Sequence, residues 1–444
     1  MTERKGLLER LALHRPELRA WAMYDWAISG VQTTVMVAVF PIFYIQVAGA
    51  GAGATRASQW WALANGLSIA IVAVLSPILG TIADFAGAKK KLLALTTGVG
   101  VLACASMYFI RPGQLLLAST LFVVAMIGAA AALVFYDALL PHIASAKEVD
   151  RVSTAAYAIG YLGGGVLLAV NLAMIQKPAW FALDRFPATV PVRLSLVSVA
   201  LWWLIFSIPL FRRVREPERR LEMDEQAGEN PVRVAIVRLI ETFRELRGYK
   251  HAFLMLVAFL IYNDGISTVQ KMAAAYGTEL GIRSDSLIAA ILIVQFVGIP
   301  ATFLFGSLAG AIGAKRSILA GLVVYLGVSV FAYTMKTAVH FYILAGMVGL
   351  VQGGTQALSR SLFATLIPRH KSGEFFGFYS VFSKFAGIFG PILFAGMIGA
   401  TGSSRNAILS VIVFFIIGGA ILTFVNVDEG ARSARDAEQA THKA

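Results

Sequence analysis

Residues 80–90 read Gly-Thr-Ile-Ala-Asp-Phe-Ala-Gly-Ala-Lys-Lys, and residues 306–316 read Gly-Ser-Leu-Ala-Gly-Ala-Ile-Gly-Ala-Lys-Arg. Each stretch follows a long apolar run, and each ends in two adjacent basic residues. Basic residues collect in the loops on one side of a membrane protein, because they avoid the hydrocarbon core. The two stretches therefore predict equivalent polar loops in the two halves of a repeated membrane protein.

A second pair of segments supports the repeat. Residues 24–32 read Tyr-Asp-Trp-Ala-Ile-Ser-Gly-Val-Gln, and residues 262–270 read Tyr-Asn-Asp-Gly-Ile-Ser-Thr-Val-Gln. Both pairs occur in the same order along the chain, which indicates a parallel repeat of two halves. Such repeats are typical of secondary transporters, in which two bundles move about a site near the middle of the membrane.

The composition of the 444-residue chain agrees with a membrane protein. Hydrophobic residues make up 58% and charged residues 14%, whereas soluble proteins carry roughly a quarter charged residues. This excludes soluble enzymes, disordered scaffolds and disulfide-rich secreted modules. The single cysteine, Cys104, excludes an intramolecular disulfide.

A membrane-spanning helix needs about 20 mostly apolar residues. Twelve stretches nearly free of charge meet that requirement and predict an all-α membrane protein with 12 transmembrane helices in two pseudo-symmetric six-helix bundles. They lie at approximately 20–47, 59–83, 91–110, 114–140, 152–176, 193–211, 251–276, 286–312, 317–335, 340–367, 375–400 and 406–427.

The longest polar segment separates the two halves. We expect an N-terminal bundle at 1–211, a cytoplasmic linker at 212–250, a C-terminal bundle at 251–427 and a cytoplasmic tail at 428–444. Within the linker, apolar residues from Val232 recur at helical spacing with arginines on the other faces, which predicts an amphipathic helix on the membrane surface.

The basic residues predict the orientation. With the N-terminus in the cytoplasm, 27 of the 38 Lys and Arg residues fall on that side, 8 on the other, and three inside spans. Both termini are therefore expected in the cytoplasm. The net charge of +13 is then a topology signal, and we expect no nucleic acid partner. Short tails without sorting signals favour a bacterial plasma membrane over a vacuole.

The chain resembles the major facilitator superfamily in its six-plus-six layout and its loop at 80–90. Within that superfamily it resembles the vacuole-effluxer branch, the autophagy-linked vacuolar amino-acid exporters of fungi and their bacterial relatives. Ile28 departs from the Asn expected in relatives, which removes a polar group from the first span. The segments that carry the resemblance are 24–27, 135–141, 160–165, 352–362 and 374–379.

Six ionisable residues lie inside predicted spans, where charge is costly and usually faces the bundle interior. The resemblance implies that spans one, four, seven and ten line a central cavity. Five of the six residues fall in those spans, and only Lys384, in span eleven, does not. This distribution favours a polar path for a substrate.

Helical spacing groups these charges with neutral polar residues. Asp25, Ser29 and Gln32 share one face of span one, and Asn263, Ser267 and Gln270 repeat that stripe in span seven. We expect these stripes and a third one in span ten to face one another. The candidate substrate or coupling residues are Tyr24, Asp25, Gln32, Asp137, Asn263, Asp264, Gln270, Lys271, Gln352, Gln356, Arg360 and Lys384.

Two interpretations of these charges remain open. In the first, Lys271 or Arg360 binds a carboxylate and Asp25 or Asp264 binds an amine, as in a site for a zwitterion, and an Asp carries the coupling proton. In the second, the charges form ion pairs between helices that hold the bundles or close a gate. For Asp137, one turn before Pro141, a gate contact is the favoured interpretation.

The loop at 80–90 supplies the candidate gating residues Gly80, Asp84, Gly87 and Lys90. Asp84 is suited to the N-terminus of a facing helix, where the helix dipole favours an anion. The resemblance implies that this loop closes the cytoplasmic side and favours an outward-facing state. Gly310 replaces Asp84 in the second half, so only one charged latch is expected.

We therefore expect an alternating-access secondary transporter of a small polar organic solute, with amino acids favoured by the resemblance and protons as the coupling ion. Alternatives are a lipid or lysolipid flippase and a transporter-like receptor without turnover. No nucleophile–base pair, metal-binding cluster or nucleotide-binding loop is evident, so we expect no enzyme activity, cofactor or metal. The expected partners are the solute and the lipid bilayer, and the expected state is a monomer.

Overall fold

The computed structural model describes residues 7–218, 241, 243–279, 282, 284–387, 389–401 and 404–443. Every assigned element in these ranges is helical. The all-α fold class predicted from the apolar runs is therefore confirmed.

The N-terminal bundle begins after the short helix α1 (Leu7–Arg10). Its first span is interrupted, because the π-helical segment η1 replaces regular α-helix and Pro41 lies in the first turn of the next helix. Its elements are α2 (Pro16–Gly30), η1 (Val31–Ala38), α3 (Phe40–Phe43), η2 (Tyr44–Ala48), α4 (Ala54–Ala86), α5 (Lys89–Ser106), η3 (Met107–Phe109), α6 (Leu115–Ile143), α7 (Val149–Gln176), η4 (Pro178–Phe181) and α8 (Thr189–Arg213).

The C-terminal bundle follows the linker and ends in a polar helix outside the bundle. Its elements are α10 (Lys250–Glu279), α11 (Ser284–Ile312), α12 (Ala314–Thr334), α13 (Ala338–Leu366), η5 (Arg369–Lys371), α14 (Ser372–Phe385), α15 (Phe389–Thr401), α16 (Ser404–Ser410), α17 (Ile412–Thr423) and α18 (Val427–Lys443).

The predicted count of twelve spans is not confirmed. Among the described residues, ten helices are long and apolar enough to cross a membrane, and the pair Pro16–Ala38 and Phe40–Ala48, bent by 41°, makes an eleventh candidate. The predicted span at 375–400 consists of α14 and α15, two helices of 14 and 13 residues. Each is shorter than the roughly 20 residues that cross the hydrocarbon core.

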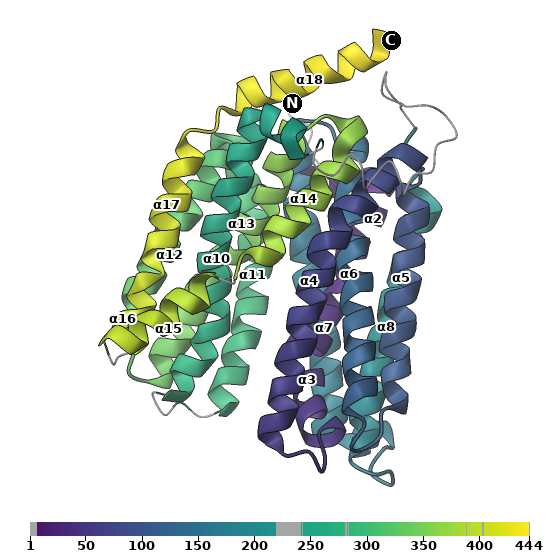
Figure 1. Cartoon of the computed structure of the whole chain (residues 1–444), viewed down its shortest axis with the longest axis vertical. Helices are drawn as coiled ribbons and strands as arrows, with labels where there is room; N and C mark the ends of the chain where they lie inside the picture. Colours follow the sequence, from purple (N-terminus) through teal and green to yellow (C-terminus); the bar gives the residue numbers. More distant parts are fainter. Residues whose placement is uncertain are drawn as a thin grey trace.

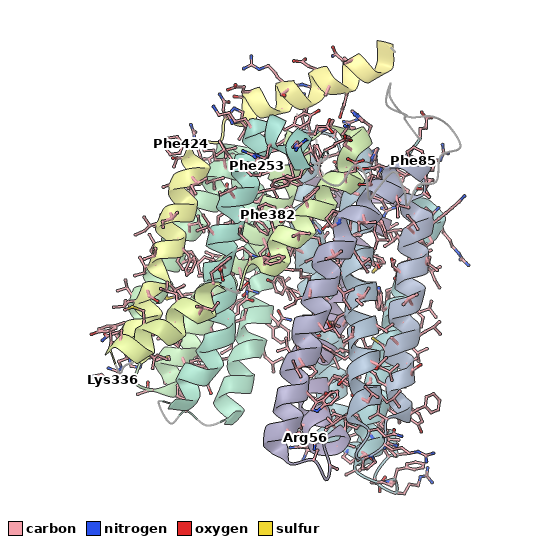
Figure 2. The ribbon with its side chains drawn as sticks, viewed as in Figure 1. Arg56, Phe85, Phe253, Lys336, Phe382 and Phe424 are labelled. Atoms are coloured by element: carbon pink, nitrogen blue, oxygen red, sulfur yellow. The ribbon has the colours of Figure 1, made fainter. Side chains whose placement is uncertain are left out.

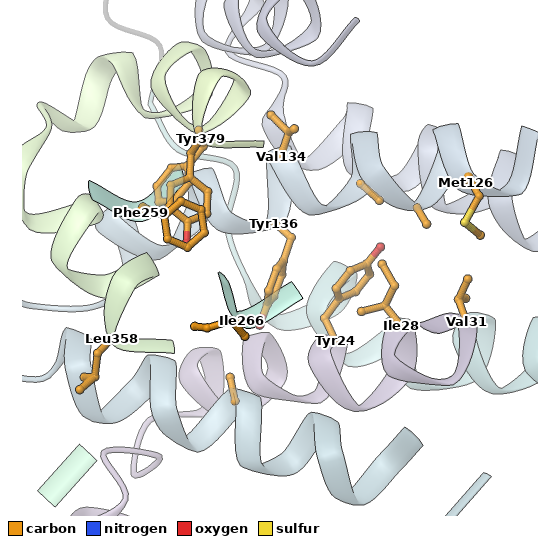
Figure 3. Close-up of a cluster of buried hydrophobic side chains, with 14 of the residues drawn as sticks. Tyr24, Ile28, Val31, Met126, Val134, Tyr136, Phe259, Ile266, Leu358 and Tyr379 are labelled. Atoms are coloured by element: carbon orange, nitrogen blue, oxygen red, sulfur yellow. The ribbon is translucent and has the colours of Figure 1, made fainter. Parts of the chain in front are cut away.

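The helices pack closely where small residues meet. A Cβ on Gly128 of α6 would lie 2.9 Å from the Cα of Gly100 on α5. Such small-residue contacts are the usual means by which membrane helices associate. Larger side chains fill the rest of the bundle interior, and Figure 3 shows Tyr24, Ile28 and Val31 of the first span facing the same core.

The two bundles lie side by side in Figure 1, with α2 to α8 on one side and α10 to α17 on the other. Both marked termini lie at one end of the molecule, which we call the terminal end, and α18 crosses it. Arg56 and Lys336 lie at the opposite end (Figure 2). Between bundles, α14 packs against α4 and α6, and α7 packs against α11 and α13.

Most of the predicted amphipathic linker helix lies outside the described residues. Its last part, residues 243–248, is helical and packs on the C-terminal bundle. The ring of Phe243 lies 5.9 Å from that of Phe253 and 5.6 Å from that of Phe378, and Leu246 is fully buried. This part of the linker therefore contacts protein on its apolar side.

Candidate functional site

Arg360 joins the two bundles through a fully buried guanidinium group. It stands on α13, two turns before the helix ends, with only 2% of its side chain exposed. Its Nη1 lies 3.2 Å from both Asp25 Oδ2 on α2 and Asp137 Oδ1 on α6. Its Nε donates to Ser153 Oγ at 2.9 Å and its Nη2 to the Ser153 carbonyl at 3.1 Å. One side chain of the C-terminal bundle thus contacts three helices of the other bundle.

Aromatic rings surround this guanidinium. The Arg360 Cζ atom lies 4.8 Å from a ring centre of Trp21, 5.6 Å from Tyr136 and 4.5 Å from Tyr157. These distances suit cation–π attraction, which strengthens when water is excluded. The Tyr136 hydroxyl donates to Asp25 Oδ2 at 2.9 Å, and Trp21 Nε1 donates to the Tyr136 carbonyl at 3.0 Å. The rings therefore also hold the first carboxylate in place.

The charges of this Arg360 cluster do not balance when all groups are ionised. Arginine stays charged in proteins, so one cation faces the two carboxylates of Asp25 and Asp137. The cluster becomes neutral when one carboxylate binds a proton.

A second polar group lies farther from the terminal end. Gln356, one turn before Arg360, donates to Asn263 Oδ1 at 3.5 Å. Gln352, one turn before Gln356, lies near Tyr161 of α7. Both glutamines are partly exposed. The amides therefore line the boundary between α13 and its neighbours beyond the Arg360 cluster.

Gln32 and Gln270, which are equivalent in the repeat, are both exposed. Gln32 follows Asp25 by seven residues, and Asp25 points across to the other bundle. Gln32 lies in the π-helical segment η1, however, so the regular α-helical spacing that predicted a shared face with Asp25 does not hold there. Tyr24 differs from both, because its hydroxyl is buried within its own bundle, 2.6 Å from Thr97 Oγ1.

Asp264 does not join the Arg360 cluster. Its carboxylate accepts backbone N–H groups at the start of α15, from Gly387 at 2.7 Å, Gly390 at 3.0 Å and Phe389 at 3.1 Å. Lys384 is partly buried near the end of α14. The Lys271 side chain lies outside the described residues.

Two of the predicted gating residues, Gly80 and Asp84, lie between α4 and α14. A Cβ on Gly80 would lie 2.1 Å from the Gly373 carbonyl oxygen, so the two backbones are in direct contact. Asp84 Oδ2 accepts the Glu374 N–H at 2.8 Å in the first turn of α14. A carboxylate is favoured there by the helix dipole.

Lys89, rather than Lys90, forms the ion pair with Asp84. Gly87 ends α4 with φ +56°, a conformation that glycine adopts easily. The reversal brings Lys89 back onto Asp84, while the Lys90 N–H donates to Glu216 at 2.9 Å. Lys89 of this basic run therefore forms a buried ion pair, whereas Lys90 contributes its backbone N–H group at the start of α5.

The equivalent loop of the second half meets α7. A Cβ on Gly306 would lie 2.2 Å from Thr154 Oγ1, so α11 and α7 are also in close contact. At Gly310, the equivalent of Asp84, the nearest side-chain atom to an added Cβ is Arg151 Nε at 4.0 Å. Arg151 makes no side-chain hydrogen bond or ion pair with any residue that the structure describes.

The structure adds site residues that the sequence analysis did not select. Ser153, Tyr157 and Tyr161 follow one another at intervals of four on α7, and all three face α13 or its arginine. Their i, i+4, i+8 spacing in the sequence could have identified them as polar residues on one face of α7. In the described ranges, no group of three or more His, Cys, Asp or Glu residues is placed to hold a metal ion.

Sequence comparisons identify the family. The family described as "Vacuole effluxer Atg22 like" matches residues 56–435. The "Uncharacterized MFS-type transporter YxiO" of Bacillus subtilis is 38% identical over 409 residues, which cover 91% of this chain and 94% of the relative. "Autophagy-related protein 22" of Yarrowia lipolytica is 27% identical over 64% of this chain, and the match spans about half (51%) of that protein.

Solved structures share the fold at low sequence identity. The proton:xylose symporter XylE matches with a TM-score of 0.69 and 11% identity, covering 93% of this chain and 95% of the symporter. A bacterial homologue of the iron transporter ferroportin in an outward-facing state matches with a TM-score of 0.65 and 15% identity, covering 92% and 98%. The helical bundles, the family match and the Bacillus relative agree, and the chain belongs to the vacuole effluxer Atg22-like family, within the major facilitator superfamily of transporters.

Proposed function

We propose that this transporter carries a small polar organic solute by alternating access, is driven by protons, and favours amino acids. The observation that carries the proposal is the buried Arg360 cluster, which joins the two bundles and has one more carboxylate than cations. The amides of Gln352 and Gln356 lie directly beyond it. Polar groups at a bundle interface in a membrane are expensive and usually functional.

The conformation fits an outward-facing state with a cytoplasmic terminal end. Gly80, Asp84 and Arg360 all make their contacts between bundles near that end. In Figure 1 the ribbons of the two bundles diverge toward the opposite end. The excess of Lys and Arg on the side of the termini supports a cytoplasmic terminal end in a cell membrane. The ferroportin homologue with a similar fold is itself described as outward-facing.

The proposed proton coupling is based on the ion pairs of Arg360, which must separate when the terminal end opens. Opening the terminal end requires Arg360 to leave Asp25 and Asp137, because these residues belong to opposite bundles. Separation of a buried pair leaves charges without partners, which is strongly unfavourable. A proton on one carboxylate removes one of the two attractions and lowers that cost. Proton binding thus favours the change to the inward-facing state.

The chemistry of the interface favours a solute with several hydrogen-bonding groups. Amides offer both donors and acceptors, and Asn263, Gln352 and Gln356 place such groups within two turns of a cation and two carboxylates. An amino acid presents the complementary carboxylate and ammonium groups. The resemblance to vacuolar amino-acid exporters supports the same class.

A lipid flippase remains the second candidate because of one apolar groove. Six residues of α11 and α13 line an open depression of about 410 Å³: Phe296, Val297, Pro300, Ala301, Leu304 and Leu350. Such a groove suits an acyl chain. Movement of a fluorescent phospholipid between leaflets, without amino-acid exchange, would favour this candidate.

The test uses the full chain in proteoliposomes. Counterflow with the standard amino acids should show saturable exchange of at least one, and an imposed pH gradient should accelerate uptake. Asp25→Asn and Asp137→Asn should lose that acceleration, whereas Asp184→Asn, in an exposed loop, should keep it. Unchanged acceleration in both cluster variants would reject the coupling role. Saturable binding without counterflow would instead indicate a receptor.

A further inference from the structure

Span eleven is divided by a sharp change of backbone direction between two helices. Ala386, after α14, is extended with φ −61° and ψ 126°, and Gly387 has φ +98°. L-residues with a side chain rarely adopt that φ, so glycine is required here. The start of a new helix at Phe389 leaves backbone N–H groups without partners inside the helix.

Asp264 of α10 supplies the partners for those groups. Its carboxylate accepts three N–H groups, from Gly387, Phe389 and Gly390, at 2.7–3.1 Å. Asp264 is only 1% exposed, and these donors and the dipole of α15 help to stabilise its charge. The N–H groups at the start of α15 thus find acceptors, and the buried Asp264 carboxylate finds donors.

Close packing also fixes the start of α15 against α10. A Cβ on Gly390 would lie 1.7 Å from Thr268 Oγ1, so no larger residue fits. The Thr268 hydroxyl in turn donates to the Asp264 carbonyl at 2.7 Å. Helix α15 is thus held to a helix of its own bundle.

Helix α14, in contrast, packs on the other bundle as well as on α10 and α13 of its own bundle, where Tyr379 stacks on Phe259 at 4.6 Å and on Phe363 at 5.3 Å. Gly373 contacts Gly80, and an added Cβ on Gly377 would lie 2.6 Å from the Ser76 carbonyl oxygen. Ser76 Oγ donates to Ser380 Oγ at 3.4 Å. The contacts with the other bundle must break when the terminal end opens. The two halves of span eleven therefore differ in one respect on either side of Gly387: both contact α10, but α14 also has contacts with the other bundle that must break.

We propose that Asp264 is a positioning residue that anchors α15 to α10, so that α14 leaves α4 during gate opening without moving α15. The inference rests on the proposed alternating-access function and assigns to span eleven a fixed half and a moving half. A hinge of this kind absorbs motion in a few backbone angles at the end of an element. Asp264 then acts through α15, and it contacts neither the solute nor the coupling proton.

Hydrogen–deuterium exchange of the purified chain tests the anchor without any transport. Asp264→Asn puts an amide donor among three N–H donors, so peptides over residues 386–392 should exchange about tenfold faster, as local opening becomes easier. Peptides from α4 and α7 should be unchanged. Asp25→Asn, which neutralises a buried carboxylate of the other bundle, should leave residues 386–392 unchanged. Equal exchange in the wild-type chain and Asp264→Asn would overturn the proposal.

A second variant tests the anchor if Asp264→Asn does not fold. Phe389→Pro removes one of the three donors at the first position of α15, where proline is compatible with a helix. Phe389 is 54% exposed, so little packing is lost. Exchange at Gly387 and Gly390 should rise in this variant too. No increase would contradict the anchor.

Transport measurements separate positioning from coupling. Asp264→Asn should lower the maximal exchange rate while KM and acceleration by a pH gradient remain unchanged, because the solute and proton sites are intact. Loss of acceleration with unaltered exchange at 386–392 would make Asp264 a coupling residue and refute the anchor.

In a Cys104→Ala background, a disulfide between Ser76→Cys and Ser380→Cys should stop transport, and reduction should restore it. Undiminished transport with the disulfide formed would show that α14 does not move.

Discussion

Arg360 illustrates how much depends on the shape of one side chain. Its planar guanidinium reaches Ser153, Asp25 and Asp137 together, through donors that point in fixed directions. A lysine keeps the charge but has one compact donor group and cannot reproduce this arrangement. The position therefore requires arginine for geometry as well as for charge.

We accordingly expect Arg360→Lys to reduce counterflow by about tenfold or more, since hydrogen bonds to charged groups contribute roughly 1.5–3 kcal/mol each. Initial rates in proteoliposomes provide the measurement. Arg369→Lys is the matched control, because that side chain is half exposed and outside the cluster. Full activity of Arg360→Lys would mean that a point charge is sufficient.

The two aspartates of the repeat show what sequence reasoning reached and where it stopped. The spacing identified Asp25 and Asp264 as buried charges in equivalent spans. In the repeat, however, Asp25 aligns with Asn263, and Asp264 stands one residue later. One residue turns a helix by about 100°. Asp25 therefore faces the other bundle, whereas Asp264 faces α15, a difference set by helix rotation and packing rather than by residue type.

At the scale of elements, the contact between α4 and α14 depends on glycine. A methyl group on Gly80 would meet the backbone of Gly373, which cannot move aside as a flexible side chain would. We expect Gly80→Ala to separate the two helices at a cost of about 1–3 kcal/mol, the usual range for overpacking. This should shift the population toward opening at the terminal end.

Accessibility of a cysteine introduced at Ser380 to a water-soluble thiol reagent, in the Cys104→Ala background, measures that shift. Labelling should be about tenfold faster with Gly80→Ala than without it. Gly66→Ala, in the same helix but with no atom near the added Cβ, should label at the parental rate. If Gly66→Ala accelerated labelling equally, the effect would be general and unrelated to the contact.

Apolar runs predicted the helical fold and the position of most spans, because length and composition decide whether a helix can cross a membrane. They did not reveal that span eleven is broken. Glycine is common inside membrane helices, so Gly387 within the run 375–400 does not by itself indicate a helix break. The break depends on Asp264, more than a hundred residues earlier, and only the packing of α10 against α15 brings the two together.

At the scale of the whole molecule, the two halves share a fold but close differently. The first half has an ionic latch, in which Asp84 binds Lys89 and the start of α14. In the second half, Lys315 instead donates to the carbonyls of Thr423 and Val425, and Gly310 lies opposite Arg151. On the proposed alternating-access function, one ion-paired contact and one weak contact would let the terminal end open at a lower cost than two ion-paired contacts would.

Restoring the missing acid tests this asymmetry. Gly310→Asp places a carboxylate in open space beside the Arg151 guanidinium, and a partly exposed pair of this kind contributes roughly up to 1 kcal/mol. We expect the added latch to favour the closed terminal end and to slow counterflow about threefold to fivefold. Gly310→Asn is the matched control, because it adds similar volume without charge, and Gly310→Asp combined with Arg151→Gln should recover the rate. If Gly310→Asp and Gly310→Asn slowed counterflow equally, the effect would come from side-chain volume and not from charge. The difference between Asp84 and Gly310 would then have no bearing on how the two halves control the gate.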